Sequence, residues 1–313
     1  MMKEPYIAAI GNACYDEYYS ADSWVENGEK LLIRPMEKQA GGMIPNAASV
    51  MAAYGVHTYL INYMNDGAGN QELKRDLAAA GLDVTHIITD NRLPDAKCII
   101  VLTPAERTVL VLDFPHPPRV LPPKTQEILR NAAYVYTTMV EMRRFENDLH
   151  QADDWRIHGA KLVFDVEASS FESPNDPLFA RADVLCFNKG GFEKYVGKRD
   201  AEACIQNLLN RGCIVSVTLG ADGCQCWDAR SHVRLPGWRV NAIDTTGAGD
   251  TFNASLVCGL LQGKTLKAAA QFANAAAAHA TTVLGPRGGA VSMDTVEAFI
   301  NHCQKGMEQH GCL

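Results

Sequence analysis

The feature that most constrains the fold is a regular alternation of short apolar runs with longer helical runs. Strand patterns at 6–11, 58–64, 133–138, 161–167, 184–188 and 213–220 are separated by helical patterns that include 44–55, 69–81 and 199–212, and the chain closes with helical patterns at 249–262, 265–283 and 292–305. Such alternation is typical of βαβ units. We therefore predict an α/β fold, with a mainly parallel central sheet and helices on both faces, formed by residues 1–313 as a single domain.

Two segments break this alternation. Residues 97–114 hold two apolar strands around the turn TPAER, a hairpin that the interior of an all-parallel sheet cannot contain. Residues 17–38 are polar and irregular, with one candidate strand at 30–34. Together the segments predict a small antiparallel sheet beside the main body, a β lid or dimer surface built from about 14–38 and 94–115.

Charge and cysteine content exclude several classes of protein. The net charge is −7 and no basic cluster stands out, so a nucleic-acid partner has no electrostatic support. No apolar run approaches the roughly 18 residues of a membrane helix, and the N-terminus does not resemble a signal peptide. The ten cysteines lack disulfide-framework or zinc-finger spacing. We expect free, mostly buried thiols in a cytoplasmic protein without a membrane partner.

A glycine turn followed at once by an acid marks the start of one helix. Gly247, Ala248 and Gly249 precede Asp250. At a helix start the first N–H groups lack acceptors, and the helix dipole favours a negative charge there. Asp250 is then either a helix cap or a base that takes a proton from a hydroxyl while the neighbouring N–H groups hold a phosphoryl group. The motif by itself leaves both interpretations open.

A second polar constellation lies near the N-terminus. Gly41 and Gly42 precede Asn46, which is expected in the first turn of a helix. Glycines bring the backbone close to a small ligand, and an asparagine both donates to and accepts from the hydroxyls of a polyol. A tight strand-to-helix turn with an Asn cap is the alternative. Asp16 follows the first strand, where open parallel sheets bind ligands; a solvated loop acid is the alternative for this residue.

Taken together, these residues resemble the ribokinase-like carbohydrate kinase family, also called PfkB. GGMIPNAASVMAAYG (41–55) is similar to its N-terminal signature, and DTTGAGDTFNASLVCGLL (244–261) to its C-terminal one. TLGADG (218–223) resembles its T-x-G-x-x-G nucleotide turn. The resemblance covers almost the whole chain. It implies a three-layer α/β sandwich with a β lid, and transfer of a phosphoryl group from ATP, with Mg²⁺, to a hydroxyl of a sugar or similar molecule.

The resemblance also implies a role for each matching residue. Asp250 would be the catalytic base, and the backbone N–H groups of Gly247, Ala248 and Gly249 the anion hole. The remaining matches are Asp16, Gly41, Gly42 and Asn46 for the sugar; Asn188, Thr218, Gly220, Gly223, Asn274 and Ala277 for ATP; and Asp244 and Thr246 for a monovalent-cation loop, with K⁺ as the candidate, closed by 284–289. Lid strands in the family often pair between subunits, so a homodimer through the lid is the candidate assembly.

One position departs from the family pattern. Many relatives carry N-x-x-E after the strand at 184–188, and the glutamate helps to organise Mg²⁺ and phosphate. Here Asn188 is kept but Gly191 stands in place of the glutamate, and Glu193 is expected to point elsewhere. The ketohexokinase-like branch also lacks that glutamate, and the run DVE (165–167) resembles that branch. This favours a ketose or ketose-derived substrate.

Two other functions compete with a sugar kinase. A nucleoside kinase of the same family would need an aromatic lid to stack a base, and Trp24, Tyr18, Tyr19 and Phe114 are its candidates. A sugar-binding regulator without turnover is supported by the missing glutamate. The intact Gly-Ala-Gly-Asp turn opposes it, because binding alone needs no base. Arg107, on the predicted hairpin, is either a contact for a substrate phosphate or carboxylate, or a solvated charge.

Overall fold

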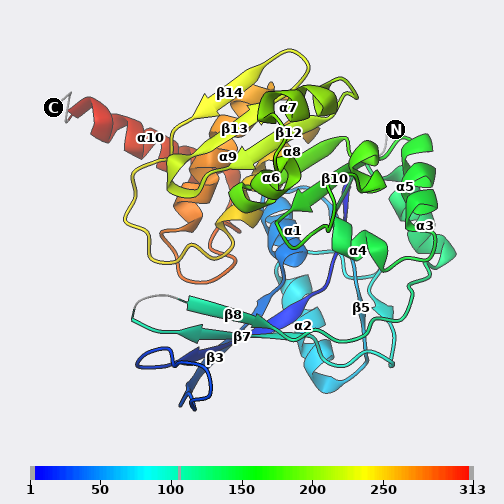
Figure 1. Cartoon of the computed structure of the whole chain (residues 1–313), viewed down its shortest axis with the longest axis vertical. Coiled ribbons are helices and arrows are strands. Elements are labelled where there is room, and N and C mark those ends of the chain that lie inside the picture. Colours follow the sequence, from blue (N-terminus) through cyan, green and yellow to red (C-terminus); the bar gives the residue numbers. More distant parts are fainter. Residues whose placement is uncertain (1–3, 105–106, 310–313) are drawn as a thin grey trace.

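The central sheet has the strand order β14-β13-β12-β11-β10-β9-β1-β4. Its strands lie among the helices of the body (Figure 1). The computed structural model describes residues 4–104 and 107–309. From β4 to β12 neighbouring strands are parallel, and β13 and β14 add an antiparallel edge. The strands are β1 Ile7–Ile10, β4 Thr58–Ile61, β9 Tyr134–Thr138, β10 Lys161–Val166, β11 Val184–Asn188, β12 Ile214–Thr218, β13 Cys224–Trp227 and β14 His232–Leu235.

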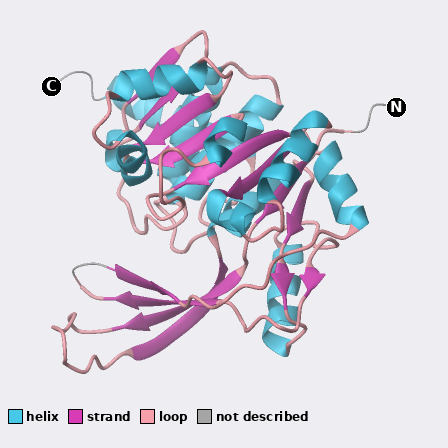
Figure 2. Cartoon of the chain, turned by 45° about the vertical axis from the view of Figure 1, so that its right-hand side comes forward, coloured by secondary structure: helices cyan, strands magenta, loops and turns pink. Residues whose placement is uncertain are grey.

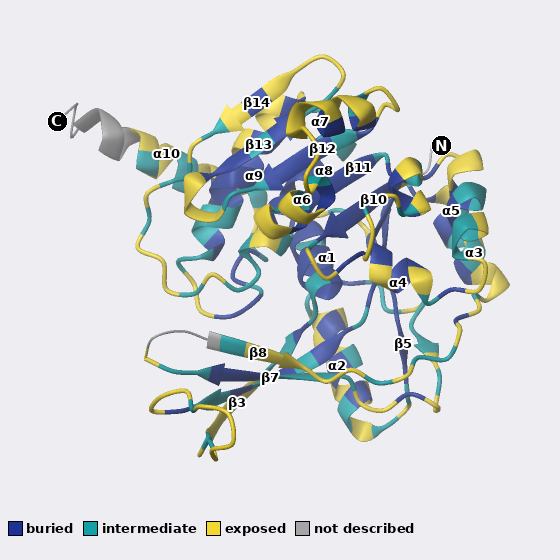
Figure 3. Ribbon diagram, in the orientation of Figure 1, coloured by how far each residue is buried: buried dark blue, intermediate teal, exposed yellow. Residues whose placement is uncertain are grey.

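Helices cover both faces of this sheet. One face carries α1 Met43–Ala53, α2 Ala68–Ala79, α8 Ala248–Leu261, α9 Leu266–Ala280 and α10 Met293–Gln309; the other carries α3 Pro123–Asn131, α4 Met139–Arg143, α5 Asp148–Ile157, α6 Lys189–Val196 and α7 Ala201–Leu209. Successive residues of β1 alternate between the two cores, Ile7 toward the first and Ala8 toward the second. Burial on both faces explains why the parallel strands are mostly apolar (Figure 3). The predicted α/β fold is confirmed.

A second sheet of four strands projects from the body as the lid (Figure 2). Its order is β3-β2-β7-β8, with β2 Cys14–Ser20, β3 Arg34–Gly41, β7 Lys97–Leu102 and β8 Arg107–Val111. The β7–β8 hairpin was predicted, and its turn includes residues 105–106, which lie outside the described residues. The prediction of a purely antiparallel lid is wrong, because β2 pairs with β7 in parallel. β2 and β7 both run outward from the body, so as neighbours they pair in parallel.

The prediction for 17–38 was also wrong in detail. The segment is not irregular up to a strand at 30–34: β2 already occupies its first residues, and β3 begins at Arg34. Asp16 therefore lies within a strand and not in a loop. The sequence CYDEYYS is polar and therefore does not have the apolar pattern of a core strand. The strand is held instead by backbone pairing with both β3 and β7. A small third sheet pairs β5 Tyr63–Met64 with β6 Ile88–Thr89.

Two expectations about sequence class can be compared with the structure. Within residues 4–104 and 107–309, no helix combines the length and apolar character that crossing a membrane requires. The nine cysteines in the described part of the chain are all free thiols, and most of them are buried, as expected.

Candidate active site

The glycine turn of the C-terminal motif is clamped against a neighbouring loop. Gly247 caps the N-terminus of α8 with φ 75°, and a Cβ at this position would lie 1.9 Å from the carbonyl oxygen of Pro286. Only glycine fits both the conformation and the contact. The first-turn N–H groups of Ala248, Gly249 and Asp250 follow. Helix geometry leaves them without intrahelical acceptors, although the N–H of Ala248 donates to the Thr245 carbonyl at 3.4 Å. The turn thus presents N–H donors at the positive end of the helix dipole.

Asp250 connects this turn to the N-terminal motif. Its Oδ2 accepts a hydrogen bond from Nδ2 of Asn46 at 3.0 Å, across 204 positions in sequence. Burial, and next the negative charge of Asp165, raise the pKa of Asp250 well above its ordinary value, with Asp16 contributing in the same direction. The two sequence motifs therefore meet at one place, and the acid between them is poised to bind a proton.

The paired glycines make room for the buried acid of the lid strand. A Cβ on Gly41 would lie 2.1 Å from Oδ2 of Asp16, so any larger residue would displace that carboxylate. Gly42 is the N-cap of α1, four residues before Asn46. Asp16 is buried, and burial raises its pKa. All four residues predicted to hold the sugar thus lie around the N-terminus of α1 and the base of the lid.

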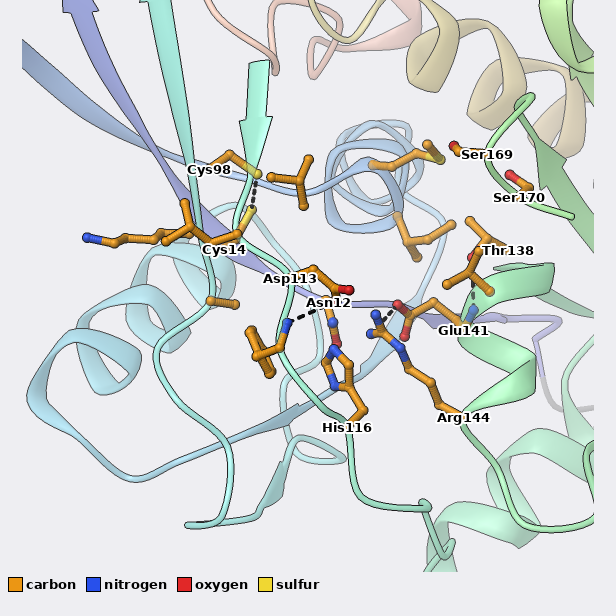
Figure 4. Close-up of a pocket in the computed structure, with 18 residues that line it drawn as sticks. Asn12, Cys14, Cys98, Asp113, His116, Thr138, Glu141, Arg144, Ser169 and Ser170 are labelled. Carbon is orange, nitrogen blue, oxygen red and sulfur yellow. Dashed lines mark hydrogen bonds and ion pairs between the residues drawn. The ribbon is translucent and has the colours of Figure 1, made fainter. Parts of the chain in front are cut away.

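A cavity of about 240 Å³ opens between the lid and the carboxyl ends of the strands (Figure 4). Asp16, Gly41, Gly42, Asn46 and Asp250 do not line it, although Cys14, Met43 and Ile44 of its wall are close to them in sequence. Its wall is mainly apolar, with polar groups at a few points. The lining residues are Asn12, Cys14, Met43, Ile44, Ala96, Lys97, Cys98, Val111, Leu112, Asp113, Phe114, His116, Thr138, Val140, Glu141, Arg144, Ser169 and Ser170. A small concave site with few convergent polar groups is typical of a small-molecule pocket.

An ion-pair network at this cavity was not predicted from the sequence. Glu141 accepts from Arg119 at 2.6 Å and from Arg144 at 2.7 Å, and Arg119 also donates to Asn12 at 2.6 Å. Asn12 follows β1, and Glu141 lies in the helix that follows β9. The rule that ligands bind at the carboxyl ends of parallel strands draws attention to both residues only once the strand order is known.

Two further acids were missed at the end of β10. Asp165 is buried and accepts from Tyr136 at 2.6 Å and from Asn253 at 2.9 Å, and burial raises its pKa to about 6. Glu167 accepts from Asn188 Nδ2 at 3.3 Å, and burial raises its pKa. Their signal was the acidic run that follows an apolar strand. Glu167 thus supplies a carboxylate beside Asn188, although position 191 carries none.

The glycine at position 191 has a steric cause. A Cβ on Gly191 would lie 2.3 Å from the carbonyl oxygen of Val166, so the end of β10 leaves no room for a side chain. The N–H of Gly191 donates to Oδ1 of Asn188 at 2.7 Å. Glu193 is exposed and faces solvent, as predicted.

The residues predicted for the nucleotide surround a second depression, which is lined by Lys189, Leu219, Asp222, Arg234, Leu235 and Pro236. Asn188 and Thr218 are register partners on β11 and β12, and Gly220 and Gly223 bracket the turn that follows. Asn274 donates to the carbonyl of Pro236 at 2.8 Å, which brings α9 to the rim, and Ala277 lies one turn further along α9. The predicted residues lie next to this depression and do not line it. Leu219 and Asp222 line it in place of Thr218 and Gly220.

The loop predicted to hold a monovalent cation is closed by hydrogen bonds. The Asp244 carboxylate accepts from the N–H of Gly285 at 3.0 Å, and from the N–H and hydroxyl of Thr246 at 2.8 and 2.6 Å. The segment 284–289 therefore does close on Asp244. The cation itself stays a prediction.

The expected aromatic lid is mostly absent from the cavity wall. Phe114 lines the cavity, and its ring lies 4.4 Å from that of His116. Trp24 is 49% exposed on the lid surface, and Tyr18 is buried within the lid. Trp24, Tyr18 and Tyr19, the other candidates for a stacking lid of a nucleoside kinase, do not line this cavity. The side chain of Arg107 lies outside the described residues.

A helix N-terminus that carries an acid and is suited to an anion, together with a small cavity at the strand ends, is an arrangement that suits phosphoryl transfer to a small molecule. The model of the pfkB family carbohydrate kinase matches residues 4–292, and the chain belongs to this family. It is therefore a carbohydrate kinase by family.

Known proteins agree with this assignment. The chain is 27% identical over 297 residues to the ATP-dependent ribose-1-phosphate kinase of Halopiger xanaduensis, covering 94% of this chain and 98% of that protein. It matches the structure of Arabidopsis thaliana ribokinase complexed with ribose and ATP with a TM-score of 0.82 and 20% identity, covering 95% of this chain and 99% of that one. A putative ribokinase II from E. coli, in complex with ATP and Mg²⁺, matches with a TM-score of 0.78 and 17% identity, covering 95% and 99%.

Proposed function

We propose that this chain transfers the γ-phosphoryl group of ATP to a hydroxyl of a small carbohydrate, with Asp250 as general base and the 247–250 backbone amides as the anion hole. The observation that carries the proposal is the hydrogen bond between Asn46 and Asp250. It places the acid beside the residues suited to hold a polyol. Burial, and next the charge of Asp165, raise the pKa of Asp250 well above its ordinary value, which makes its carboxylate a stronger base.

The substrate side is completed by groups that still lack partners. Within the described residues, Oδ1 of Asn46 is buried and has no hydrogen-bond partner. Buried polar atoms are nearly always paired, so a ligand hydroxyl that donates to this oxygen would satisfy it. Asp16 offers a second acceptor at the same site. A cavity of about 240 Å³ suits a single small sugar, and we favour a ketose or another sugar derivative.

The residues around Asn188 fit Mg²⁺, which prefers oxygen ligands. Glu167 offers a carboxylate next to the Asn188 amide. This carboxylate supplies the negative charge that Gly191 cannot. We propose that Glu167 and Asn188 help to hold the ion. When bound, Mg²⁺ neutralises phosphate charge. The loop of Asp244 and Thr246 is our candidate for a monovalent cation such as K⁺.

A nucleoside is the second candidate substrate, because Phe114 and His116 offer a ring pair in the cavity wall. A thermal-shift panel of ketohexoses, keto-deoxy acids and nucleosides, each with an ATP analogue, distinguishes the two classes. Selective stabilisation by nucleosides would replace the sugar proposal.

The decisive experiment measures ADP release by wild type and Asp250→Asn with the sugar that the panel identifies. We expect kcat to fall about 10²–10⁴-fold, the range for a lost general base, with sugar affinity little changed. Asp294→Asn, which alters an acid in the first turn of α10, is the matched control and should retain activity. Equal turnover by Asp250→Asn would refute the assigned base, and the absence of turnover in wild type would favour a sugar-binding regulator.

A further inference from the structure

Three side chains that can ligate a metal meet where the lid joins the body. Cys14 and Asp16 lie two residues apart on β2, and Cys98 on β7 is the register partner of Asp16. Residues two apart on a strand share a face, and register partners on neighbouring strands share it as well. The sheet geometry alone therefore brings the three side chains together, although the cysteines are 84 positions apart.

The distances between these atoms match tetrahedral zinc. The two sulfur atoms lie 3.9 Å apart, and Sγ of Cys14 lies 3.7 Å from Oδ1 of Asp16. The three ligand atoms all lie within 4.8 Å of one another. Zinc–sulfur bonds of about 2.3 Å and zinc–oxygen bonds of about 2.1 Å at tetrahedral angles require separations of about 3.8 and 3.6 Å. An ion would fit between these ligands with little movement of the backbone.

The surroundings favour a thiophilic ion. Two thiols select zinc or cadmium over magnesium and calcium. Cys14 and Asp16 are buried, whereas Cys98 is half-buried, and both cysteines line the cavity, so an ion can enter from it (Figure 4). Arg287 lies within electrostatic range of Asp16 and Cys14, and its Nε and Nη2 have no hydrogen-bond partner within the described residues. Its positive charge would balance the net negative charge of two thiolates and a carboxylate around Zn²⁺.

We propose that Cys14, Cys98 and Asp16 form a three-ligand zinc site whose fourth position opens to the cavity. Each thiol releases its proton to solvent as the metal binds, and the carboxylate binds as the anion. A disulfide is a poorer fit, because the 3.9 Å between the sulfur atoms is almost twice the roughly 2.05 Å of an S–S bond. One consequence rests on the proposed function, in which Asp16 holds the sugar: zinc at this site competes with the substrate.

Metal binding is tested without any assay of activity. Metal-free, reduced full-length protein is titrated with Co²⁺ under nitrogen, and then with Zn²⁺ to displace it. We expect a thiolate-to-cobalt absorption band that saturates at one ion per chain and is lost on zinc addition. Cys14→Ser and Cys98→Ser should each weaken binding by at least about 10-fold to 100-fold. Cys303→Ser, at another half-buried thiol, is the matched control and should bind as wild type does.

Several results would overturn the site. They are the absence of the cobalt absorption band in wild type, a cobalt affinity of Cys98→Ser equal to that of wild type, or loss of the band in Cys303→Ser. Loss of two titratable thiols in air without metal, reversed by reductant, would instead identify a redox pair. Circular dichroism of each variant verifies that a lost band is not a lost fold.

Competition is tested separately, at free zinc fixed by a metal buffer. Zinc should raise the KM for sugar in wild type and leave kcat unchanged, while Cys98→Ser should show the same KM with and without zinc. If the cobalt band appears but the KM does not move, the metal site stands and the placement of the sugar at Asp16 is wrong. If no sugar is phosphorylated at all, the proposed function fails while the metal titration still decides the site.

Discussion

The body and the lid of this molecule are built on different principles. In the body, helices bury both faces of the sheet, and side chains such as Trp155 and Phe164 are completely enclosed. In the lid, four strands stand out from the body, and β8 leaves Val109 47% and Val111 71% exposed (Figure 3). The proposed base and its glycine turn belong to the body, whereas Asp16 and the cysteine pair belong to the lid. We infer that the well-buried body carries the chemistry of the proposed reaction and that the lid, with less buried area, selects the substrate.

The strongest test of this division is the glycine turn of the body. Gly247→Ala would drive a Cβ into the Pro286 carbonyl and displace the anion-binding amides. We expect kcat to fall about 10²–10³-fold, the cost of losing one such donor. The control is Gly263→Ala, which has a similar φ of 72° but nothing within 4 Å of the added Cβ. It should lose about 1–2 kcal/mol of stability and no turnover. Normal kcat for Gly247→Ala would remove the turn from catalysis.

The second test compares a buried side chain of the body with a buried side chain of the lid. Trp155→Ala empties a fully buried site in the body and should lower the free energy of unfolding by about 3–5 kcal/mol. Ile100→Ala, at a buried position in the lid, should cost less global stability because the lid can open locally, and should instead raise the KM. Urea unfolding and steady-state kinetics measure both quantities. An equal loss of global stability would show that lid and body unfold as one unit.

The exposed strand β8 sharpens the comparison through assembly. We propose that its apolar side chains pair between two copies of the chain, which would bury the face that the lid leaves open. Val109→Lys should then halve the mass measured by light scattering at micromolar concentration. Ile157→Lys, at an apolar residue of the body that is 81% exposed, is the control and should leave the mass unchanged. A monomeric wild type would contradict the proposed dimer.

The smallest expected effect is a shift in pH dependence. The charge of Asp165 helps to raise the pKa of Asp250, so Asp165→Asn should lower that pKa. A base must be deprotonated to act, so kcat rises with pH through the pKa, and the acid limb of the profile should move to lower pH in the variant. The profile of kcat against pH measures the shift. A limb that moves to higher pH would exclude the assigned coupling.

Most of the body was predictable from the sequence, and most of the lid was not. Strands buried on both faces, such as 161–166, can be identified by their apolar composition, and a glycine turn indicates where α8 begins. Strand β2 was missed because CYDEYYS is polar and takes its stability from two neighbouring strands. In the site, Asp250 and Asn46 were identifiable from their motifs. Glu141 and Glu167 were not, because their roles depend on strand ends that only the sheet order brings together.

Gly191 has a consequence for any attempt to redesign this edge of the sheet. A glutamate introduced there by one mutation would meet the Val166 carbonyl before it could meet a ligand, since even a Cβ would lie 2.3 Å from that oxygen. An acid can therefore be installed at 191 only together with changes that move the end of β10, whereas the carboxylate at 167 can be altered alone.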